Sequence, residues 1–293
     1  MIAENKTTQG LTLRNGRFLA YAEYGNPTGK PVIYCHGSPG SHLDLANMEE
    51  TINQAGVRLI ALDRPGIGLS DFKPGYQLLD WPDDVIELAD ELDLDKFDML
   101  GLSGGGPFCA ACSYKIPERL TKASLVSGIG LIDVPGATEG MGQTNKRVFS
   151  MARRANWLIR LQYALMARGL KSDPDRVLKQ MKTAFPEPDR VLLEQHPEEA
   201  QSLLASMSEA LRAGTEGITH EWSLYVRPWG FNLEDISIEV DLWHGEADTN
   251  VPVSMGQQMA QAIPNSTTHF LPNEGHVSLF VNHMEEILSE LVG

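Results

Sequence analysis

Short apolar runs alternate with longer amphipathic segments along most of this chain, and Gly, Pro, Asn or Asp bound the runs. This alternation is typical of strands that helices connect into a mostly parallel sheet. The expected strands are a hairpin at 12–25, which turns at Asn15-Gly16, and single strands at 31–37, 57–63, 97–103, 122–128, 239–245 and 267–272. The expected helices are 43–55, 82–93, 104–115, 254–262 and 283–291. The pattern therefore predicts an α/β fold.

Residues 133–214 break this alternation. They contain no β-like run, and their apolar residues recur at helical spacing: Val148, Met151, Ala155, Leu158, Leu161 and Leu165. Four prolines divide the segment into several helices, because proline removes a backbone donor and clashes with the preceding turn: Pro174, Pro186, Pro188 and Pro197. We therefore expect a sheet-based core formed by 1–132 and 215–293, with 133–214 as a helical insertion.

The net charge is acidic but unevenly distributed. The 293 residues, 42% of them hydrophobic, suffice for one large domain or two small ones, and 39 acidic against 24 basic residues give a net charge of −15. This charge disfavours nucleic acid as a partner. Residues 140–172 hold seven basic residues and no Asp or Glu, which leaves 17 basic and 39 acidic residues, a charge of −22, elsewhere. We expect the arginines of 140–172 to pair with that acidic remainder, and a role in steering an anionic substrate or in lying on an anionic lipid surface stays open.

We expect a soluble, cytoplasmic protein without stable membrane insertion. The first residues, MIAENKTTQG, lack the basic patch and apolar run of a secretory signal, and no stretch of about 18 apolar residues occurs. Three cysteines do not suit a disulfide framework in a chain of this length. Cys109 and Cys112 have C-x-x-C spacing, but they lie in the expected helix 104–115 among Ala and Phe, where we expect them to pack as small hydrophobic residues.

The strongest chemical signal is GLSGG at 101–105, a G-x-S-x-G between an expected strand and an expected helix. A serine on such a tight turn must adopt a strained backbone, and flanking glycines leave room for the turn and for the helix to approach the sheet. The hydroxyl of Ser103 would then project at a helix N-terminus, where amides and the helix dipole favour negative charge. Ser103 is the candidate nucleophile.

A serine nucleophile needs a base to take its proton, and the base needs a carboxylate to fix its tautomer. His276 follows the expected strand 267–272, and Asp248 follows 239–245, so both belong at the carboxyl edge of the sheet. The chain order Ser103, Asp248, His276 fits three loops after successive strands. Weaker candidates are His244, His269 and His283 for the base, and Asp133 and Glu246 for the acid.

An acyl-transfer intermediate also carries an oxyanion, which needs two preorganised N–H donors. One should be the amide of Gly104, directly after the nucleophile. The other should come from the loop HGSPGS at 36–41, where Pro39 has no N–H and Ser38 is therefore the favoured donor. We expect His36 to shape this loop through hydrogen bonds of its ring rather than to act as a base.

Five motifs in this order resemble the α/β-hydrolase superfamily, in its carboxylesterase-like subgroup with a serine nucleophile and a helical cap: HGSPGS (36–41), DRPGIGLSD (63–71), GLSGGG (101–106), LWHGEADTNVP (242–252) and NEGHVSLF (273–280). The resemblance implies an eight-stranded, mostly parallel sheet flanked by helices, with 133–214 as a cap inserted after strand six. It also implies structural roles for Asp63 and Arg64. Serine at the nucleophile position departs from the dehalogenases and epoxide hydrolases of the superfamily and excludes their aspartyl ester.

The expected function is hydrolysis of a carboxylic ester through an acyl-enzyme on Ser103, with no metal and no organic cofactor. A lactone, a C–C bond flanked by carbonyls or an N-terminal proline amide could be the scissile group instead, and Glu194, Glu198 and Glu199 keep the last of these open. A small-molecule receptor with little turnover, an acyltransferase and a perhydrolase also remain. The partner is a small-molecule ester or related acyl compound, and the protein is a monomer or homodimer.

The insertion is also rich in methionine: Met141, Met151, Met166, Met181 and Met207. Methionine is flexible enough to form an adaptable pocket wall. We favour ordinary core filling for these side chains.

Overall fold

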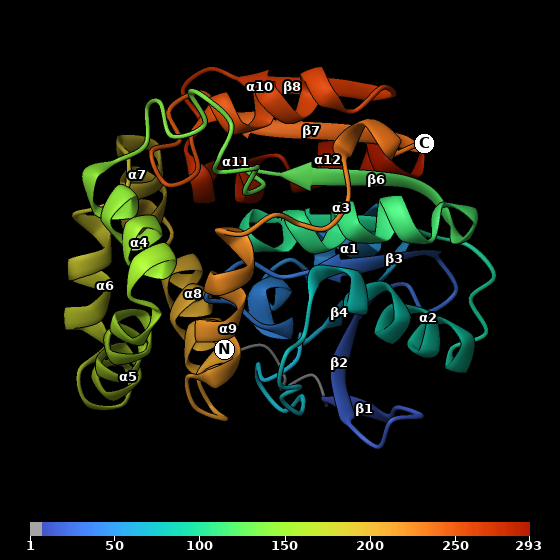
Figure 1. Ribbon diagram of the computed structural model, residues 1–293, viewed down its shortest axis with the longest axis horizontal. Coiled ribbons are helices and arrows are strands. Elements are labelled where there is room, and N and C mark those ends of the chain that lie inside the picture. The colour runs from blue at the N-terminus through green and yellow to red at the C-terminus, as the bar shows by residue number, and fades with distance from the viewer. Residues whose placement is uncertain (1–7) are drawn as a thin grey trace.

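The computed structural model describes residues 8–293 and contains one eight-stranded sheet (Figure 1). The strand order is β1-β2-β4-β3-β5-β6-β7-β8. Pairing is antiparallel between β1 and β2 and between β2 and β4, and parallel from β4 through β3 to β8. The strands are β1 (Gln9–Thr12), β2 (Phe18–Gly25), β3 (Lys30–Cys35), β4 (Val57–Leu62), β5 (Phe97–Leu102), β6 (Leu120–Val126), β7 (Glu239–Gly245) and β8 (Ser266–Leu271). The predicted α/β class and the mostly parallel sheet are confirmed.

Helices cover both faces of the sheet because apolar side chains line both faces of its central strands. On one face lie α2 (Trp81–Glu91), α3 (Gly106–Lys115) and α10 (Val253–Ala262). On the other lie α1 (Glu49–Gln54), α11 (His276–Asn282) and α12 (Met284–Val292). The expected helix 43–55 is a 3-10 turn at His42–Leu45 followed by α1, and α11 was not expected at all.

A group of helices lies beside the carboxyl ends of the parallel strands, at one end of the molecule (Figure 1). It contains α4 (Gln143–Arg154), α5 (Asn156–Ser172), α6 (Pro174–Lys182), α7 (Glu187–Gln195) and α8 (Pro197–Ala210), all within 133–214. Pro174 and Pro197 are the first residues of α6 and α8, as their missing N–H groups favour. The next helix, α9 (Glu216–Tyr225), packs on α4 and α5 although the sequence placed it in the core range. The division into core and cap stays a prediction.

Candidate active site

Ser103 lies at the turn between β5 and α3. Its φ of 52° is a left-handed conformation that residues other than glycine rarely adopt. The flanking glycines permit this turn: a Cβ on Gly101 would lie 2.7 Å from the Cβ of Cys109, and one on Gly105 would lie 2.0 Å from the main-chain oxygen of Cys35. Side chains at these two positions would push α3 away from the sheet, so the local sequence dictates the turn that presents the hydroxyl.

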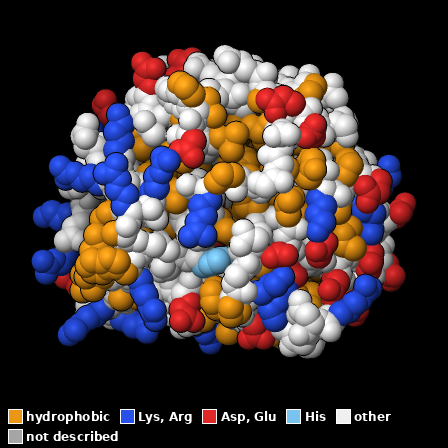
Figure 2. All heavy atoms as spheres, viewed as in Figure 1, with side chains coloured by type: hydrophobic (Ala, Val, Ile, Leu, Met, Phe, Trp, Pro, Cys, Tyr) orange, Lys and Arg blue, Asp and Glu red, His pale blue; other side chains and the backbone are white. Residues whose placement is uncertain are grey.

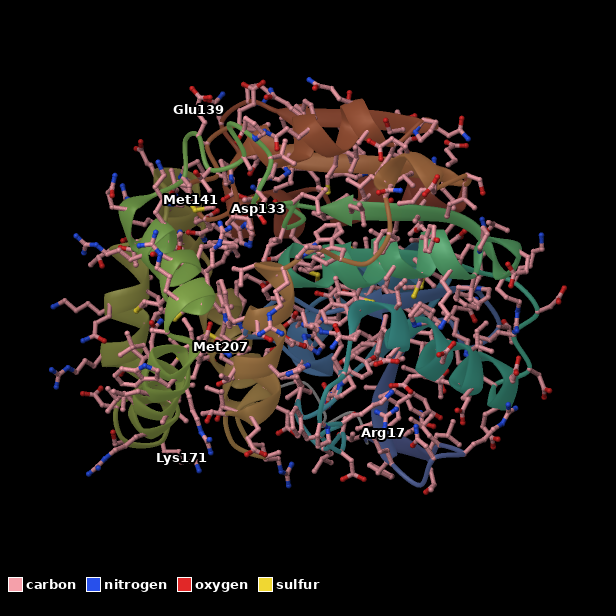
Figure 3. The ribbon with its side chains drawn as sticks, in the orientation of Figure 1. Arg17, Asp133, Glu139, Met141, Lys171 and Met207 are labelled. Atoms are coloured by element: carbon pink, nitrogen blue, oxygen red, sulfur yellow. The ribbon has the colours of Figure 1, made fainter. Side chains whose placement is uncertain are left out.

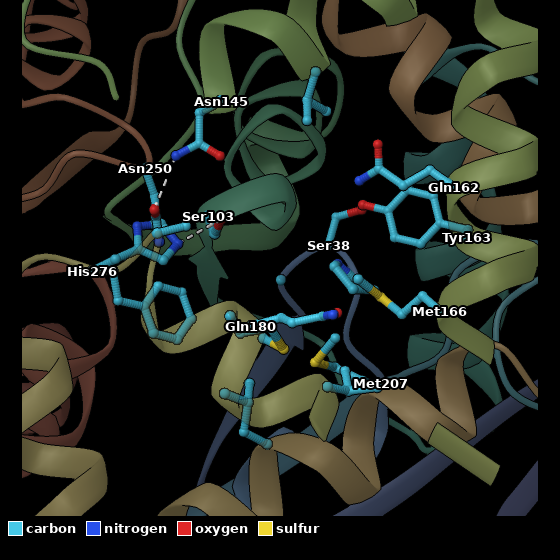
Figure 4. A pocket seen from close by; sticks show the side chains of 18 of the residues that line it. Ser38, Ser103, Asn145, Gln162, Tyr163, Met166, Gln180, Met207, Asn250 and His276 are labelled. Carbon is cyan, nitrogen blue, oxygen red and sulfur yellow. Dashed lines mark hydrogen bonds between the residues drawn. The ribbon is translucent and has the colours of Figure 1, made fainter. Parts of the chain in front are cut away.

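His276, the first residue of α11, and Asp248, in the loop after β7, lie next to each other beside Ser103, and Figure 4 shows His276 next to Ser103. Nε2 of His276 lies 2.9 Å from Oγ of Ser103, and Nδ1 lies 2.6 Å from Oδ2 of Asp248. The other carboxylate oxygen of Asp248 accepts hydrogen bonds from the amides of Asn250 (2.7 Å) and Val251 (3.0 Å). Because an ionised carboxylate only accepts, the proton of the neutral imidazole is on Nδ1, and Nε2 can accept the serine proton. The structure thus brings the three predicted side chains into one hydrogen-bonded chain.

The surroundings of His276 favour its protonated form. Burial by itself would lower the pKa of His276, but the charge of Asp248, the hydrogen bond to Asp248 and the charge of Asp189 together raise that pKa above its ordinary value. An imidazolium that forms when Nε2 takes a proton is therefore stabilised by the carboxylates around it.

The weaker candidates for the base have other partners. His244 contacts the main-chain oxygen of Val251 at 2.8 Å, His269 stacks on the ring of Trp243, and His283 lies between Glu274 and Glu286.

The weaker candidates for the acid lie elsewhere. Asp133 forms an ion pair with Arg153, and Glu246 is exposed to solvent.

The loop after β3 lies against the Ser103 turn. A Cβ on Gly104 would lie 2.6 Å from the Cβ of Ser38, and a Cβ on Gly37 would lie 3.7 Å from the Cβ of Ser103. The two expected oxyanion donors, Ser38 and Gly104, are therefore neighbours beside Ser103. That their N–H groups bind an oxyanion stays a prediction.

A buried ion pair holds this loop. Nε of Arg64 lies 2.5 Å from Oε1 of Glu221 in α9, and Nη1 of Arg64 donates to the main-chain oxygen of His36 at 2.5 Å. Oε2 of Glu221 accepts hydrogen bonds from the hydroxyls of Ser38 (3.1 Å) and Tyr225 (3.2 Å). Glu221 is a functional-site neighbour that the sequence reasoning missed, because nothing in its local sequence marks a buried carboxylate.

The contacts of His36 and Asp63 fit the structural roles expected for them. Nδ1 of His36 lies 2.7 Å from the main-chain oxygen of Gly37, and burial together with the charge of Arg64 lowers the pKa of His36 well below its ordinary value. Asp63 accepts hydrogen bonds from the amide and from Nδ1 of His42, both at 2.8 Å. His36 is therefore neutral and engaged within its own loop.

Asp189, in α7, is a second residue that sequence reasoning missed. Its buried carboxylate accepts hydrogen bonds from three successive amides at the start of α11, those of His276 (3.0 Å), Val277 (3.0 Å) and Ser278 (2.9 Å). Burial raises the pKa of Asp189, while the amides of Ser278 and His276 and the charge of His276 oppose that rise. A residue of the inserted segment thus fixes the backbone that carries His276.

A cavity of about 1080 Å³ is lined by Ser103 and His276 and by side chains of α4, α5, α6 and α8. Its walls are mostly apolar, and its polar side chains include Asn145, Gln162, Tyr163, Gln180 and Asn250 (Figure 4). Four of the five methionines considered above also line it: Met151, Met166, Met181 and Met207. Core filling was therefore an incomplete interpretation of these side chains, since they pack against the core and form the cavity wall as well.

Cys109 and Cys112 are fully buried in α3 (relative exposure 0%), and burial raises the pKa of both thiols well above the ordinary value. Their packing role is thereby supported. Within residues 8–293, no group of three or more His, Cys, Asp or Glu side chains is arranged to hold a metal ion. In the same range, no helix has the length and apolar character needed to cross a membrane.

Comparison with known proteins shows the relationships of the chain. The family model described as the alpha/beta hydrolase family matches residues 32–290. The chain is 27% identical to a 2-hydroxy-6-oxononadienedioate/2-hydroxy-6-oxononatrienedioate hydrolase from Pseudomonas putida, over 94% of this chain and 92% of that protein. It is 34% identical to a non-heme chloroperoxidase from Streptomyces lividans. That match covers 45% of this chain and 49% of the chloroperoxidase, so it spans about half the length of that relative. A thermophilic esterase from Thermogutta terrifontis has the same fold, with a TM-score of 0.70, 23% identity and 98% coverage of both chains.

Proposed function

This chain belongs to the alpha/beta hydrolase family, and from that premise we propose that it is a serine hydrolase of carboxylic esters. The observation that carries the proposal is the hydrogen-bonded chain from Ser103 through His276 to Asp248 at the floor of an apolar cavity. A largely apolar cavity with a few polar groups suits a small organic acyl compound. The similarity to the Thermogutta terrifontis esterase supports the fold in which these side chains meet, but it does not identify a substrate.

The mechanism follows from the roles that these atoms can play. As Oγ of Ser103 attacks the acyl carbon, Nε2 of His276 takes its proton, and Asp248 holds the imidazole through Nδ1. The amides of Ser38 and Gly104 bind the oxyanion of the tetrahedral intermediate. The bond from the acyl carbon to the alcohol oxygen then breaks, and His276 returns the proton to that oxygen. Water, activated by His276 in the same way, attacks the acyl-enzyme and releases the acid and free Ser103.

The test is turnover of short-chain p-nitrophenyl esters by the wild type, Ser103→Ala and Ser150→Ala. Ser150 is exposed on α4 and does not line the cavity, so it serves as the matched control. We expect Ser103→Ala to lose about 10⁴- to 10⁶-fold in kcat and Ser150→Ala to retain the wild-type rate. Equal rates for Ser103→Ala and the wild type would overturn the proposal. Stoichiometric labelling of Ser103 without steady-state turnover would point to a receptor instead.

A second candidate is hydrolysis of a C–C bond flanked by carbonyls. This candidate is favoured by the similarity to the 2-hydroxy-6-oxononadienedioate/2-hydroxy-6-oxononatrienedioate hydrolase from Pseudomonas putida. That match covers nearly the whole of both chains. The cavity lining includes Arg168 and Arg176, which could bind a carboxylate of such a compound. Parallel assays with esters and with a vinylogous 1,5-diketone distinguish the two, since the preferred substrate is the one with the higher kcat/KM.

A further inference from the structure

One helix of the inserted segment exposes large apolar side chains to solvent. Trp157, Leu161 and Leu165 of α5 have relative exposures of 66%, 50% and 63%. Their four-residue spacing places them on one stripe of the helix. Scattered exposed apolar residues are ordinary, whereas a contiguous stripe that contains a tryptophan marks an interaction surface.

The segment that carries this stripe is basic, and most of its cations have no acidic partner among the described residues. Of the seven basic residues in 140–172, only Arg153 and Arg160 form ion pairs among the described residues, with Asp133 (2.8 Å) and Glu216 (3.7 Å). Among the described residues, Arg147, Arg154 and Arg168 form no ion pair, so the expected pairing of the arginines is found for Arg153 and Arg160 only, and Lys146 and Lys171 form no ion pair either. Figure 2 shows a hydrophobic patch among Lys and Arg side chains at this end of the molecule, and Figure 3 labels Lys171 there, at the end of α5.

The stripe is continuous with the mouth of the cavity over Ser103. Leu161 and Leu165 are half exposed and at the same time line that cavity, together with Arg168. Two apolar side chains of the stripe therefore belong to the wall of the cavity as well as to the exposed surface.

We propose that α5 docks on an anionic lipid surface, and that the substrate of this site is a lipid-borne ester with a long aliphatic chain that enters the cavity past Leu161 and Leu165. The substrate part rests on the proposed ester hydrolysis, whereas the docking part does not. A helix with Trp and Leu on one side and Arg and Lys beside them is the type that lies in the plane of a membrane interface. Its cations complement the negative charge of anionic headgroups.

A second copy of this chain is a poorer occupant of the same surface. A two-fold contact through α5 would bring the stretch 140–172 of one copy, with a charge of +7, against the same stretch of the other. Repulsion between like charges opposes that contact.

The docking test uses flotation of the full-length protein with vesicles of phosphatidylcholine alone or mixed with phosphatidylglycerol. We expect binding to the anionic vesicles only. Arg154→Gln combined with Lys171→Gln should weaken binding about 25-fold, since each cation near such a surface contributes about fivefold. Arg14→Gln combined with Lys96→Gln removes the same charge from exposed positions of the core and should leave binding unchanged. Trp157→Gln should also weaken binding, without any change in net charge.

The substrate test measures hydrolysis by the wild type and Trp157→Gln, because Trp157 does not line the cavity. We expect the two proteins to hydrolyse a soluble short-chain ester equally and Trp157→Gln to hydrolyse a long-chain ester in anionic vesicles several-fold more slowly. Equal vesicle binding by all variants, no binding by the wild type, or a dimer that Trp157→Gln dissociates would overturn the docking proposal. Vesicle binding without hydrolysis of any ester would overturn the proposed function and leave docking in place.

Discussion

Replacement of Asp189 tests whether the inserted segment positions His276. The carboxylate accepts three amide hydrogen bonds of 2.9–3.0 Å and is fully buried, so it acts as a cap for α11 that is supplied by α7. Hydrogen bonds to a charged group contribute about 1.5–3 kcal/mol each, but removal of the side chain also removes the cost of burying its charge. We therefore expect Asp189→Ala to lower the free energy of unfolding by about 2–4 kcal/mol, less than the sum of three bonds.

The substitution Asp189→Asn removes the negative charge of this side chain and keeps its size, so it tests the effect of the charge on His276 separately from the effect of packing. The negative charge of Asp189 contributes to the raised pKa of His276, so its removal lowers that pKa. Because His276 must be neutral to accept the serine proton, kcat/KM rises with pH through the pKa of His276. We expect the acid limb of the kcat/KM profile to move to lower pH in Asp189→Asn.

The assay is the pH dependence of kcat/KM for a soluble short-chain ester, with Glu194→Gln as the control. Glu194 is an acid of the same helix that is exposed to solvent, so its replacement makes the same change in net charge at the surface. If Asp189→Asn and Glu194→Gln had the same acid limb, the electrostatic link between Asp189 and His276 would be wrong. If Asp189→Ala also unfolded like the wild type in urea, the capping role would be wrong as well.

Three further predictions concern the framework of the site. Glu221→Gln should lower the free energy of unfolding by about 3–5 kcal/mol, because it leaves the charge of Arg64 buried without its partner, and urea denaturation measures this. Gly105→Ala should destabilise the fold by about 1–3 kcal/mol or more, since its Cβ would lie 2.0 Å from the main-chain oxygen of Cys35. Gly128→Ala is the matched control, because the nearest atom to its Cβ would lie at 3.6 Å, and equal unfolding of the two variants would contradict the argument. Burial raises the pKa of Cys35 to about 11, and all three cysteines are buried, so a thiol reagent at neutral pH should label none of them until denaturant unfolds the chain.

The strands were predictable because each is a short apolar run bounded by turn residues. The expected strand 239–245 coincides with β7, and the expected strand 57–63 differs from β4 by one residue. Helix α11 was missed for a physical reason. It has seven residues, and the carboxylate that caps it comes from Asp189, 87 positions before His276. The sequence around His276 therefore gives no indication that a side chain so distant along the chain caps this helix.

The sequence by itself determined the local chemistry of the site. Glycines at 101 and 105 are required by the turn that presents Ser103, and this requirement concerns neighbouring residues. The order of strands and loops also predicts that Asp248 and His276 lie at the same edge of the sheet.

The tertiary structure alone decided what surrounds that chemistry. Asp189 supports His276 and Glu221 pairs with Arg64 only because of the tertiary packing, and among the described residues most of the cations of 140–172 have no acidic partner. The tertiary structure also placed the exposed stripe of α5 at the mouth of the cavity. Each of these features depends on the packing of segments that are distant along the chain, whereas hydrophobic periodicity and motif spacing report only the conformation of neighbouring residues.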